Sequence, residues 1–270
     1  MDQFSLKRKT IIVTGGTGIL GNAFIEAIVE AGGNVGILGR NEKVANERAE
    51  AINKNGGNAL PLIADVTNEE QLMAAKEKAL SHFGKIDGLI NGAGGNMPEG
   101  TLLPNQDIFS MNLQGMKKVT DLNLWGTVIP TQIFGEAIAK GGGGSIINIS
   151  SMNSKRAVTR VLGYNMGKAA VDTFTQWYAV ELANRYGDKI RMNALAPGFF
   201  LTEQNRSLLT KEDGGYTERG ELVIKHTPFK RFGNADELKG AIVWLLSDAS
   251  KFVTGSMIYV DGGFSIFGGV

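Results

Sequence analysis

The stretch Thr10-Ile11-Ile12-Val13-Thr14-Gly15-Gly16-Thr17-Gly18-Ile19-Leu20-Gly21 decides the fold of this chain. Residues 10–14 are all β-branched, which predicts a short buried strand, and residues 22–31 carry apolar side chains at helical spacing. Strand, glycine turn and helix in this order are typical of a dinucleotide site, because glycines let the backbone approach a pyrophosphate whose charge rests on the amides at the helix start. A tight turn without a ligand is the alternative.

Length and composition favour one α/β domain over residues 1–270. The chain has 270 residues, 43% hydrophobic and 20% charged, which is enough to bury a large core. The net charge of +1, with both signs interspersed, argues against nucleic acid or an anionic membrane surface as partner. Zero cysteines exclude disulfides and thiol catalysis, and two histidines argue against a metal site.

The chain also gives an expectation about its location. No apolar run reaches the roughly 18 residues that a membrane-spanning helix needs. The N-terminal residues lack the charged-then-apolar layout of a secretory signal. The expected location is therefore the cytoplasm.

A second motif, Tyr164-Asn165-Met166-Gly167-Lys168, opens the apolar-periodic run 169–182, which predicts a helix. Residues four apart share a helix face, about 5 to 6 Å apart at Cβ, so the Lys168 ammonium can lie beside the Tyr164 phenol. A cation at ~4 Å in an effective dielectric of ~20 favours the phenolate by roughly 4 kcal/mol, which would lower the phenol pKa by at most about 3 units. The pair predicts a general acid or base, with a surface helix pair as the alternative.

Residues 145–151 form a predicted buried strand that ends in two hydroxyls, Ser150 and Ser151. A strand of this kind before a helix with Tyr and Lys predicts a site at the carboxyl end of a sheet. With the glycine turn, these motifs resemble the short-chain dehydrogenase/reductase family over essentially the whole sequence. The resemblance implies a doubly wound parallel sheet of Rossmann type, helices on both faces, and NAD(P)-dependent interconversion of a ketone and a secondary alcohol.

The resemblance also implies a catalytic set. Ser151, thirteen residues before Tyr164, takes the position that polarises the substrate, and Tyr164 exchanges the proton. Lys168 holds the nicotinamide ribose and lowers the tyrosine pKa, while Asn123 bends its helix through a bound water and joins a proton relay with the lysine. A strand-end cap is the alternative for Ser151 and the favoured interpretation of Ser150.

The end of the second predicted strand, 34–38, bears on cofactor choice. An acidic side chain there would bind a ribose 2′-hydroxyl, whereas Arg40 can hold a 2′-phosphate. NADP(H) is therefore favoured and NAD(H) stays open, with a solvated helix-start residue as the alternative for Arg40. The family more often places its glycines as T-G-x-x-x-G-x-G, and Ile19 stands at the middle glycine position here, which changes the local turn.

Other cofactor contacts come from the resemblance. Asp65 and Val66 would lie against the adenine, and the run 91–94 matches the N-x-A-G element, in which Asn91 can tie neighbouring strands together. Thr202 matches a threonine that contacts the nicotinamide amide or pyrophosphate. The expected cofactor-binding residues are Gly15, Thr17, Gly18, Ile19, Leu20, Arg40, Asn41, Asp65, Val66, Asn91, Ala93, Gly94, Tyr164, Lys168, Pro197, Gly198 and Thr202.

Two segments are expected to enclose the substrate. Residues 95–116 are long and weakly periodic, which is typical of a functional loop. The polar segment 201–228 is the expected lid, and its His226 is interpreted as a helix-end residue rather than an acid or base. The remaining expected elements are strands at 59–64, 86–90 and 257–260, a strand followed by a turn at 190–198, and helices at 69–83, 119–139 and 236–246.

Substrate identity rests mainly on resemblance. The runs 197–206, 151–153 and 226–228 resemble the D-mannonate oxidoreductases (fructuronate reductases) of the same family, which act on a six-carbon sugar acid. Amides and hydroxyls suit a polyol, and Arg160 and Arg206 are the hypothesised carboxylate partners. The expected substrate-binding residues are Asn96, Ser151, Asn153, Arg160, Tyr164, Phe199 and Arg206.

Alternatives remain open for both activity and assembly. The protein could reduce another carbonyl, such as gluconate at its 5-position, another sugar or an acyl thioester, or it could sense nucleotides without turnover. The apolar tail 264–270 is hard to bury in a monomer of this size. A homotetramer or homodimer is therefore expected.

Overall fold

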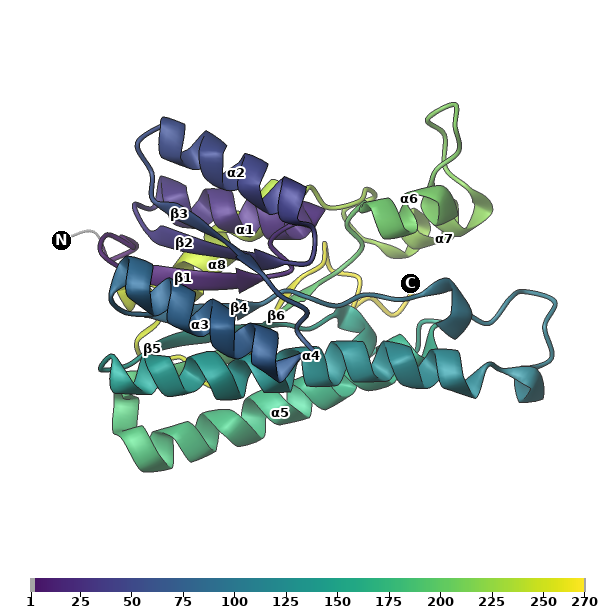
Figure 1. Ribbon diagram of the computed structural model, residues 1–270. Coiled ribbons are helices and arrows are strands. Elements are labelled where there is room, and N and C mark those ends of the chain that lie inside the picture. The colour runs from purple at the N-terminus through teal and green to yellow at the C-terminus, as the bar shows by residue number, and fades with distance from the viewer. Residues whose placement is uncertain (1–2, 270) are drawn as a thin grey trace.

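The computed structural model describes residues 3–269, with the side chains of residues 203 and 204 left aside. The predicted domain and tail therefore extend past this range at Met1, Asp2 and Val270. The described strands form a seven-stranded parallel sheet in the order β3-β2-β1-β4-β5-β6-β7 (Figure 1). They are β1 (Thr10–Thr14), β2 (Asn34–Gly39), β3 (Ala59–Ile63), β4 (Gly88–Asn91), β5 (Gly144–Ile149), β6 (Ile190–Pro197) and β7 (Met257–Val260).

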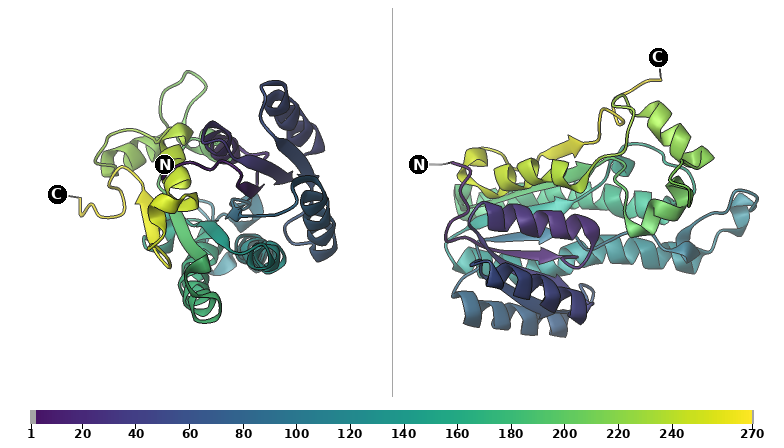
Figure 2. Two further views of the ribbon diagram at one scale, coloured as in Figure 1. Left: turned by 90° about the vertical axis from the view of Figure 1, so that its left-hand side faces the viewer. Right: turned by 90° about the horizontal axis from the view of Figure 1, so that it is seen from above.

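Helices cover both faces of this sheet (Figures 1 and 2). One face carries α1 (Ile19–Glu30), α2 (Glu42–Lys54) and α8 (Lys239–Leu246), and the other carries α3 (Glu69–Phe83), α4 (Leu113–Lys140) and α5 (Leu162–Tyr186). Each layer buries its own apolar cluster, with Phe24 in the first and Phe134 in the second. The predicted doubly wound fold is confirmed. Its strand order reverses between β1 and β4, where such sheets bind ligands at their carboxyl edge.

Asparagine side chains begin three of the helices. Asn41 accepts a 3.2 Å hydrogen bond from the Val44 amide at the start of α2, and Asn112 accepts one of 3.0 Å from Gly115 at the start of α4. Asn68 caps α3 in the same way. Such caps satisfy amides that the first helical turn leaves unpaired. Because of the Asn112 cap, α4 begins at Leu113 rather than at residue 119 as predicted.

Other boundaries also differ from the prediction. Helix α1 begins at Ile19, inside the glycine run, and β4 covers Gly88–Asn91 rather than 86–90. The predicted helix 236–246 is divided, because Asn234 and Glu237 cap a 3-10 helix at Ala235–Leu238 before α8 begins. Segment 95–116 holds two short 3-10 helices and the first turn of α4.

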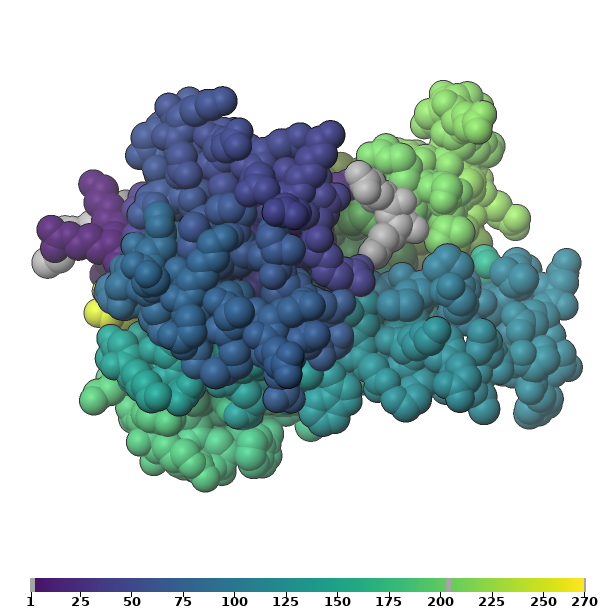
Figure 3. Space-filling model, viewed as in Figure 1, coloured from purple at the N-terminus to yellow at the C-terminus, as the bar shows by residue number. Residues whose placement is uncertain are grey.

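The predicted lid segment folds as two helices, α6 (Glu203–Leu209) and α7 (Glu218–His226). They pack over a small apolar cluster of Leu209, Val223 and Phe232. His226 ends α7, with Nδ1 2.8 Å from the Leu222 carbonyl oxygen, as expected of a helix-end residue. The lid and segment 97–112 project at the end of the molecule toward which the strands point (Figures 1 and 3). Among residues 3–269, every helix is too short or too polar to cross a membrane.

Candidate active site

The glycine turn after β1 leaves room for a ligand at the start of α1. Gly15 has a φ of +68°, and a Cβ there would lie 2.7 Å from the Gly92 carbonyl carbon. A Cβ on Gly21 would lie 2.2 Å from the Gly15 oxygen, whereas one on Gly18 would make only an ordinary contact of 3.4 Å. Gly18 is the N-cap of α1 and brings no side-chain cap. The exposed amides and positive dipole end of α1 therefore fit a pyrophosphate.

The end of β4 is held by side chains from neighbouring elements. Thr14 Oγ1 accepts hydrogen bonds from the amides of Gly92, at 3.1 Å, and Ala93, at 3.2 Å. The Asn91 amide donates 2.8 Å hydrogen bonds to Asn148 on β5 and Thr131 on α4. Asn91 is buried, and its side chain ties neighbouring strands together, as the sequence predicted.

Asn123 and Lys168 converge on the backbone after β4. A Cβ on Gly94 would lie 2.7 Å from Asn123 Oδ1 and 3.3 Å from Lys168 Nζ. The fully buried Asn123 amide also grips Gly95, accepting from its N–H at 3.1 Å and donating to its carbonyl at 2.8 Å. Glycine at position 94 therefore lets the asparagine and lysine of the predicted relay share one small space.

Ser151 and Tyr164 form a hydroxyl pair beside this space. Burial raises the pKa of Tyr164, and Ser151 lies close enough to the phenol to oppose this effect. Lys168 Nζ lies 5.6 Å from the centre of the Tyr164 ring. The rise in pKa is opposite to the predicted lowering of the tyrosine pKa by Lys168, because burial of the phenol is the largest effect.

Lys168 is itself buried, and its amine points toward the sheet. Nζ donates a 2.6 Å hydrogen bond to the Ile149 carbonyl at the end of β5. Burial lowers the pKa of Lys168 to about 8, against the opposing attraction of Asp172. Spacing alone could predict that Lys168 and Tyr164 share a helix face. It could not predict that the Lys168 amine is buried, which is what lowers its pKa.

Asp172 is a site residue that sequence reasoning missed. It lies one helical turn after Lys168 on α5, and Ser150 donates a hydrogen bond to its carboxylate. Ser150 was expected to cap the strand end, and this is wrong because its hydroxyl bonds across to α5 instead. The signal for Asp172 was available in the sequence, since acid and amine four residues apart share a helix face.

The rim next to β2 carries the residues expected to read the ribose. Arg40 is 77% exposed at its side chain and lies 3.6 Å from the Asp65 carboxylate. Burial would raise the pKa of Asp65, but hydrogen bonds from Thr67 and the charge of Arg40 outweigh it and lower the pKa. Thr17 fills the place of a side chain at Gly39, since a Cβ there would lie 2.8 Å from the threonine oxygen.

Two further residues complete this rim. Asn41 is occupied as the cap of α2, and Val66 is buried against Gly126 of α4. Arg48 was not predicted, yet its guanidinium donates to the carbonyls of Gly16 and Gly18 and so places a cation at the glycine turn. A single arginine in an amphipathic helix gives no sequence signal of such a contact.

Two asparagines expected to bind substrate, Asn96 and Asn153, differ in how their side chains are used. Asn96 donates to Thr101 at 2.6 Å, and its buried Oδ1 has no partner among the described residues. Asn153 is buried and donates to Asn165 at 2.8 Å, while its own amide bonds Ser151. Asn153 therefore supports the loop that carries Ser151, and Asn96 is the amide with unused capacity.

The lid end of the site follows β6. Gly198 donates to the Val260 carbonyl at 2.9 Å after β6 ends at Pro197, and Thr202 begins α6 through a capping box with Asn205. Phe199 packs edge-on against Phe264, with ring centres 5.2 Å apart. Of the described tail residues 264–269 none is buried, and Ile266 is 85% exposed, as expected of a tail that is hard to bury within one protomer. Arg206 is exposed on α6.

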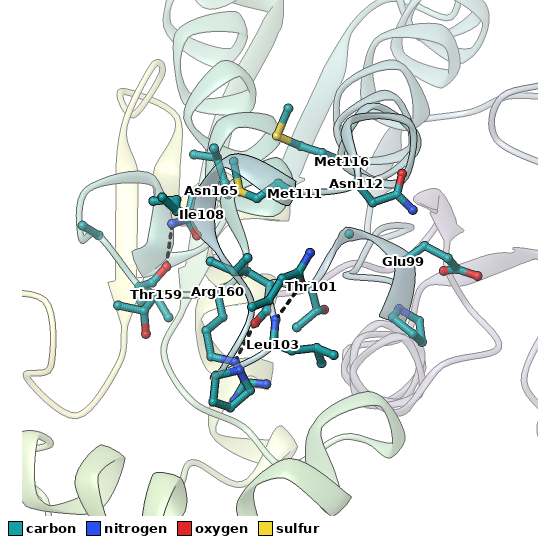
Figure 4. Close-up of a pocket in the computed structure, with 18 residues that line it drawn as sticks. Glu99, Thr101, Leu103, Ile108, Met111, Asn112, Met116, Thr159, Arg160 and Asn165 are labelled. Atoms are coloured by element: carbon teal, nitrogen blue, oxygen red, sulfur yellow. Dashed lines mark hydrogen bonds between the residues drawn. The ribbon is translucent and has the colours of Figure 1, made fainter.

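A pocket of about 560 Å³ lies between segment 98–112 and the loop before α5 (Figure 4). Arg160 and Asn165 line it, but among its described lining residues are neither Ser151 nor Tyr164. In Figure 4 the Arg160 side chain lies at the opposite end from Met111 and Met116. Asn165, a pocket residue, accepts a hydrogen bond from Asn153 and so connects the pocket wall to the loop that carries Ser151.

Comparison with known proteins agrees with this geometry. A family model described as enoyl-(acyl carrier protein) reductase matches residues 17–265. An uncharacterized oxidoreductase of Bacillus subtilis is 39% identical, over 98% of each protein. Two solved structures each match over 98% of both proteins: a candidate D-mannonate oxidoreductase from Haemophilus influenza with bound NAD, at 37% identity and a TM-score of 0.89, and a gluconate 5-dehydrogenase from Burkholderia cenocepacia with NADP and tartrate, at 32% and 0.85.

A doubly wound sheet with a glycine turn, a hydroxyl pair and a buried lysine at one edge defines a nicotinamide-dependent oxidoreductase. The chain belongs to the short-chain dehydrogenase/reductase family.

Proposed function

We propose that this enzyme interconverts D-fructuronate and D-mannonate, with Ser151, Tyr164, Lys168 and Asn123 as its catalytic residues. The observation that carries the chemistry is that Lys168 and Asn123 meet at Gly94, with the Lys168 amine 5.6 Å from the centre of the Tyr164 ring. Two neighbours that act on sugar acids by their names, a mannonate oxidoreductase and a gluconate 5-dehydrogenase, support the substrate class.

In the direction of reduction, Ser151 and Tyr164 donate hydrogen bonds to the substrate carbonyl oxygen. A nicotinamide cofactor, with its pyrophosphate held at the glycine turn, would supply the hydride that reduces the carbonyl carbon. Tyr164 then gives its proton to the oxygen, and a raised pKa suits a phenol that must be protonated at the start of this step. Lys168 lies where it can stabilise the resulting phenolate, and with Asn123 it passes a replacement proton from water.

For the cofactor we propose a preference for NADP(H). The Arg40 guanidinium is mostly exposed after the end of β2, so it can turn toward a 2′-phosphate, and Arg48 adds a second cation at the glycine turn. Position 39 is glycine, and Thr17 occupies the space that a side chain at this position would need. The two solved neighbours contain NAD and NADP, so both cofactors belong in the assay.

For the substrate, Asn96 has a buried oxygen without a partner among the described residues, and Arg160 lines the pocket. Phe199 provides an apolar wall on the lid side. Arg206, exposed on α6, could reach a carboxylate only if the lid turns it inward. These groups together suit a polyhydroxy acid better than an apolar ketone.

One assay tests the proposal. Purified protein should oxidise NADPH, and more slowly NADH, when D-fructuronate is added, followed by absorbance. The Tyr164→Phe protein should bind the cofactor as well as the wild type and lose turnover by about 100-fold or more, since it lacks the exchangeable proton. Activity retained in Tyr164→Phe would refute the catalytic assignment.

The second candidate is a reductase of another sugar acid, such as a gluconate 5-dehydrogenase, which the neighbour with NADP and tartrate favours. A panel of 2-keto and 5-keto hexonates and neutral ketoses separates these substrates. A third candidate, a nucleotide sensor without turnover, predicts cofactor binding that is unaffected by Tyr164→Phe and no reduction of any member of the panel.

We also propose that the protein is one domain with residues 201–228 as its lid, and that it works in the cytoplasm as a homotetramer or homodimer. Large exposed apolar side chains on α4 and α5, Trp125, Trp177 and Val180, support association through these helices. Light scattering of the purified protein tests the assembly.

A further inference from the structure

Two arginines from different segments meet where the lid approaches the rest of the molecule. Arg219 lies in the first turn of α7, and its Nη2 is 3.4 Å from the carbonyl oxygen of Thr159, the residue before Arg160. This contact brings the Arg219 guanidinium to the residue next to Arg160, and burial and then the charge of Arg160 lower the pKa of Arg219. Like charges brought together in this way repel, so an anion between them would be attracted.

The position of Arg160 is fixed by its backbone and by one edge of its own side chain. Its φ is +78°, a left-handed conformation that is uncommon for any residue except glycine. The Arg160 carbonyl accepts from the Leu102 amide and its Nε donates to the Leu102 carbonyl, both at 2.9 Å (Figure 4). Because Nε is occupied, the guanidinium can offer its two terminal amino groups elsewhere.

These two arginines differ from others in the protein in how their charge is balanced. Arg231 binds Glu237 through two hydrogen bonds of 2.6 and 2.7 Å, and Arg40 lies 3.6 Å from Asp65. Among the described side chains, neither Arg160 nor Arg219 has a carboxylate within ion-pair distance. Two partly buried guanidinium groups without an acid are what a ligand carboxylate needs, because each can donate a pair of parallel hydrogen bonds.

We propose that Arg160 and Arg219 together form the site for the substrate carboxylate, with Arg219 as the partner that the lid supplies. The inference rests on the proposed function, since it concerns the acid group of the same sugar acid. Binding of the carboxylate removes the repulsion between the two cations and joins α7 to the loop that leads into Tyr164. The pair thereby sets the preference for a sugar acid over a neutral sugar.

The test compares D-fructuronate with D-fructose, a neutral ketose, at saturating cofactor. Arg160→Gln and Arg219→Gln should each raise KM for D-fructuronate by about 10- to 100-fold, the range for a lost hydrogen bond to a charged group. Neither substitution should change KM for D-fructose or for the cofactor by more than a few-fold. Arg219→Lys, which keeps the charge but loses the fork, should fall between Arg219→Gln and the wild type.

The matched control is Lys225→Gln, which removes one positive charge from the exposed face of the same helix α7. It should leave both KM values unchanged. Binding of D-fructuronate to the Tyr164→Phe protein loaded with NADP, measured by calorimetry, gives a readout without turnover, and adding Arg219→Gln should weaken it by the same factor.

The outcomes separate this inference from the proposed function. A wild type that prefers D-fructuronate while Arg160→Gln and Arg219→Gln keep that preference overturns the arginine site and leaves the proposed substrate intact. A wild type that reduces D-fructose as well as D-fructuronate overturns both. Equal losses on both substrates identify the arginines as structural and also overturn the site.

Discussion

The Nζ atom of Lys168 donates a 2.6 Å hydrogen bond to the carbonyl oxygen of Ile149, the last residue of β5. The bond joins the helix that carries Tyr164 to the strand that delivers Ser151, so both hydroxyls are held in register. It also keeps an amine inside the protein, where its charged form is costly. For this reason the pKa of Lys168 falls to about 8.

Stability should therefore depend on pH through Lys168. The unfolded protein keeps this amine protonated up to the ordinary pKa of 10.5, while the folded protein releases the proton near 8. Between these values the unfolded state binds more protons, so stability rises with pH. The difference in unfolding free energy between wild type and Lys168→Met, measured in urea, should increase by about 2 to 3 kcal/mol from pH 7.5 to 10.5. A difference that stays flat or falls contradicts this.

Asp172 should tune the lysine. Its carboxylate favours the charged amine, so Asp172→Asn should lower the pKa of Lys168 further and shift the alkaline limb of the kcat/KM profile to lower pH. Ser150→Ala, which removes the hydrogen bond that holds the carboxylate, should shift the limb in the same direction by less. A loss of activity with an unmoved limb would mean that Asp172 is only structural.

Two glycines of the turn, Gly15 and Gly18, should differ sharply in their tolerance of a side chain. Gly15→Ala places a Cβ 2.7 Å from backbone atoms at a positive φ, so it should destabilise the protein by more than about 1 kcal/mol and weaken nucleotide binding. Gly18→Ala meets its nearest atom at 3.4 Å and should change the unfolding free energy little. Urea unfolding and a nucleotide titration by fluorescence measure both. Equal effects would show that the turn relaxes around either methyl.

Arg40 should decide cofactor preference. Arg40→Glu should raise KM for NADPH by about 10- to 100-fold, because a carboxylate repels the 2′-phosphate, and should leave KM for NADH nearly unchanged. Lys43→Glu, an equally exposed cation in the first turn of α2, is the control for a general change of charge. If both cofactors respond alike, Arg40 does not read the 2′ position.

The second apolar cluster should contribute strongly to stability. Phe134 is fully buried on α4, and Phe134→Ala should cost about 3–5 kcal/mol in unfolding free energy through lost burial and the cavity left behind. Phe109, 96% exposed, provides the matched comparison, and Phe109→Ala should change the unfolding free energy by less than about 0.5 kcal/mol. A small effect at Phe134 would mean that the layer repacks.

The features that the sequence predicted correctly depend on interactions between residues close together in the chain. The β-branched run before Gly15 and the spacing of Tyr164 and Lys168 are local patterns, and they led correctly to the fold, the family and the class of reaction. Spacing could not give the direction of the Tyr164 pKa, because that depends on how much water the surrounding elements exclude.

Contacts between distant segments were the other limit. Arg48 reaches the glycine turn from α2, and Arg219 reaches Thr159 from the lid, over separations that no local pattern encodes. Ser150 likewise bonds Asp172 on another element. The start of α4 was predicted six residues too late, at 119 rather than 113. The sequence does carry a signal for the true start, since asparagine is a favoured N-cap residue and Asn112 caps the helix, but the nearby Gly115 obscured it.

The two hydrogen bonds between the Asn123 side chain and the Gly95 backbone make the catalytic region independent of segment 97–112, which follows Gly95 directly in sequence. Its amide fixes the backbone just before segment 97–112 begins, and it does so without using any side group of that segment. Sequence drift in residues 97–112 can therefore reshape the pocket, and with it the range of sugars accepted, while the geometry of proton transfer stays constant. New substrate preferences can therefore evolve in this fold while the catalytic residues stay the same.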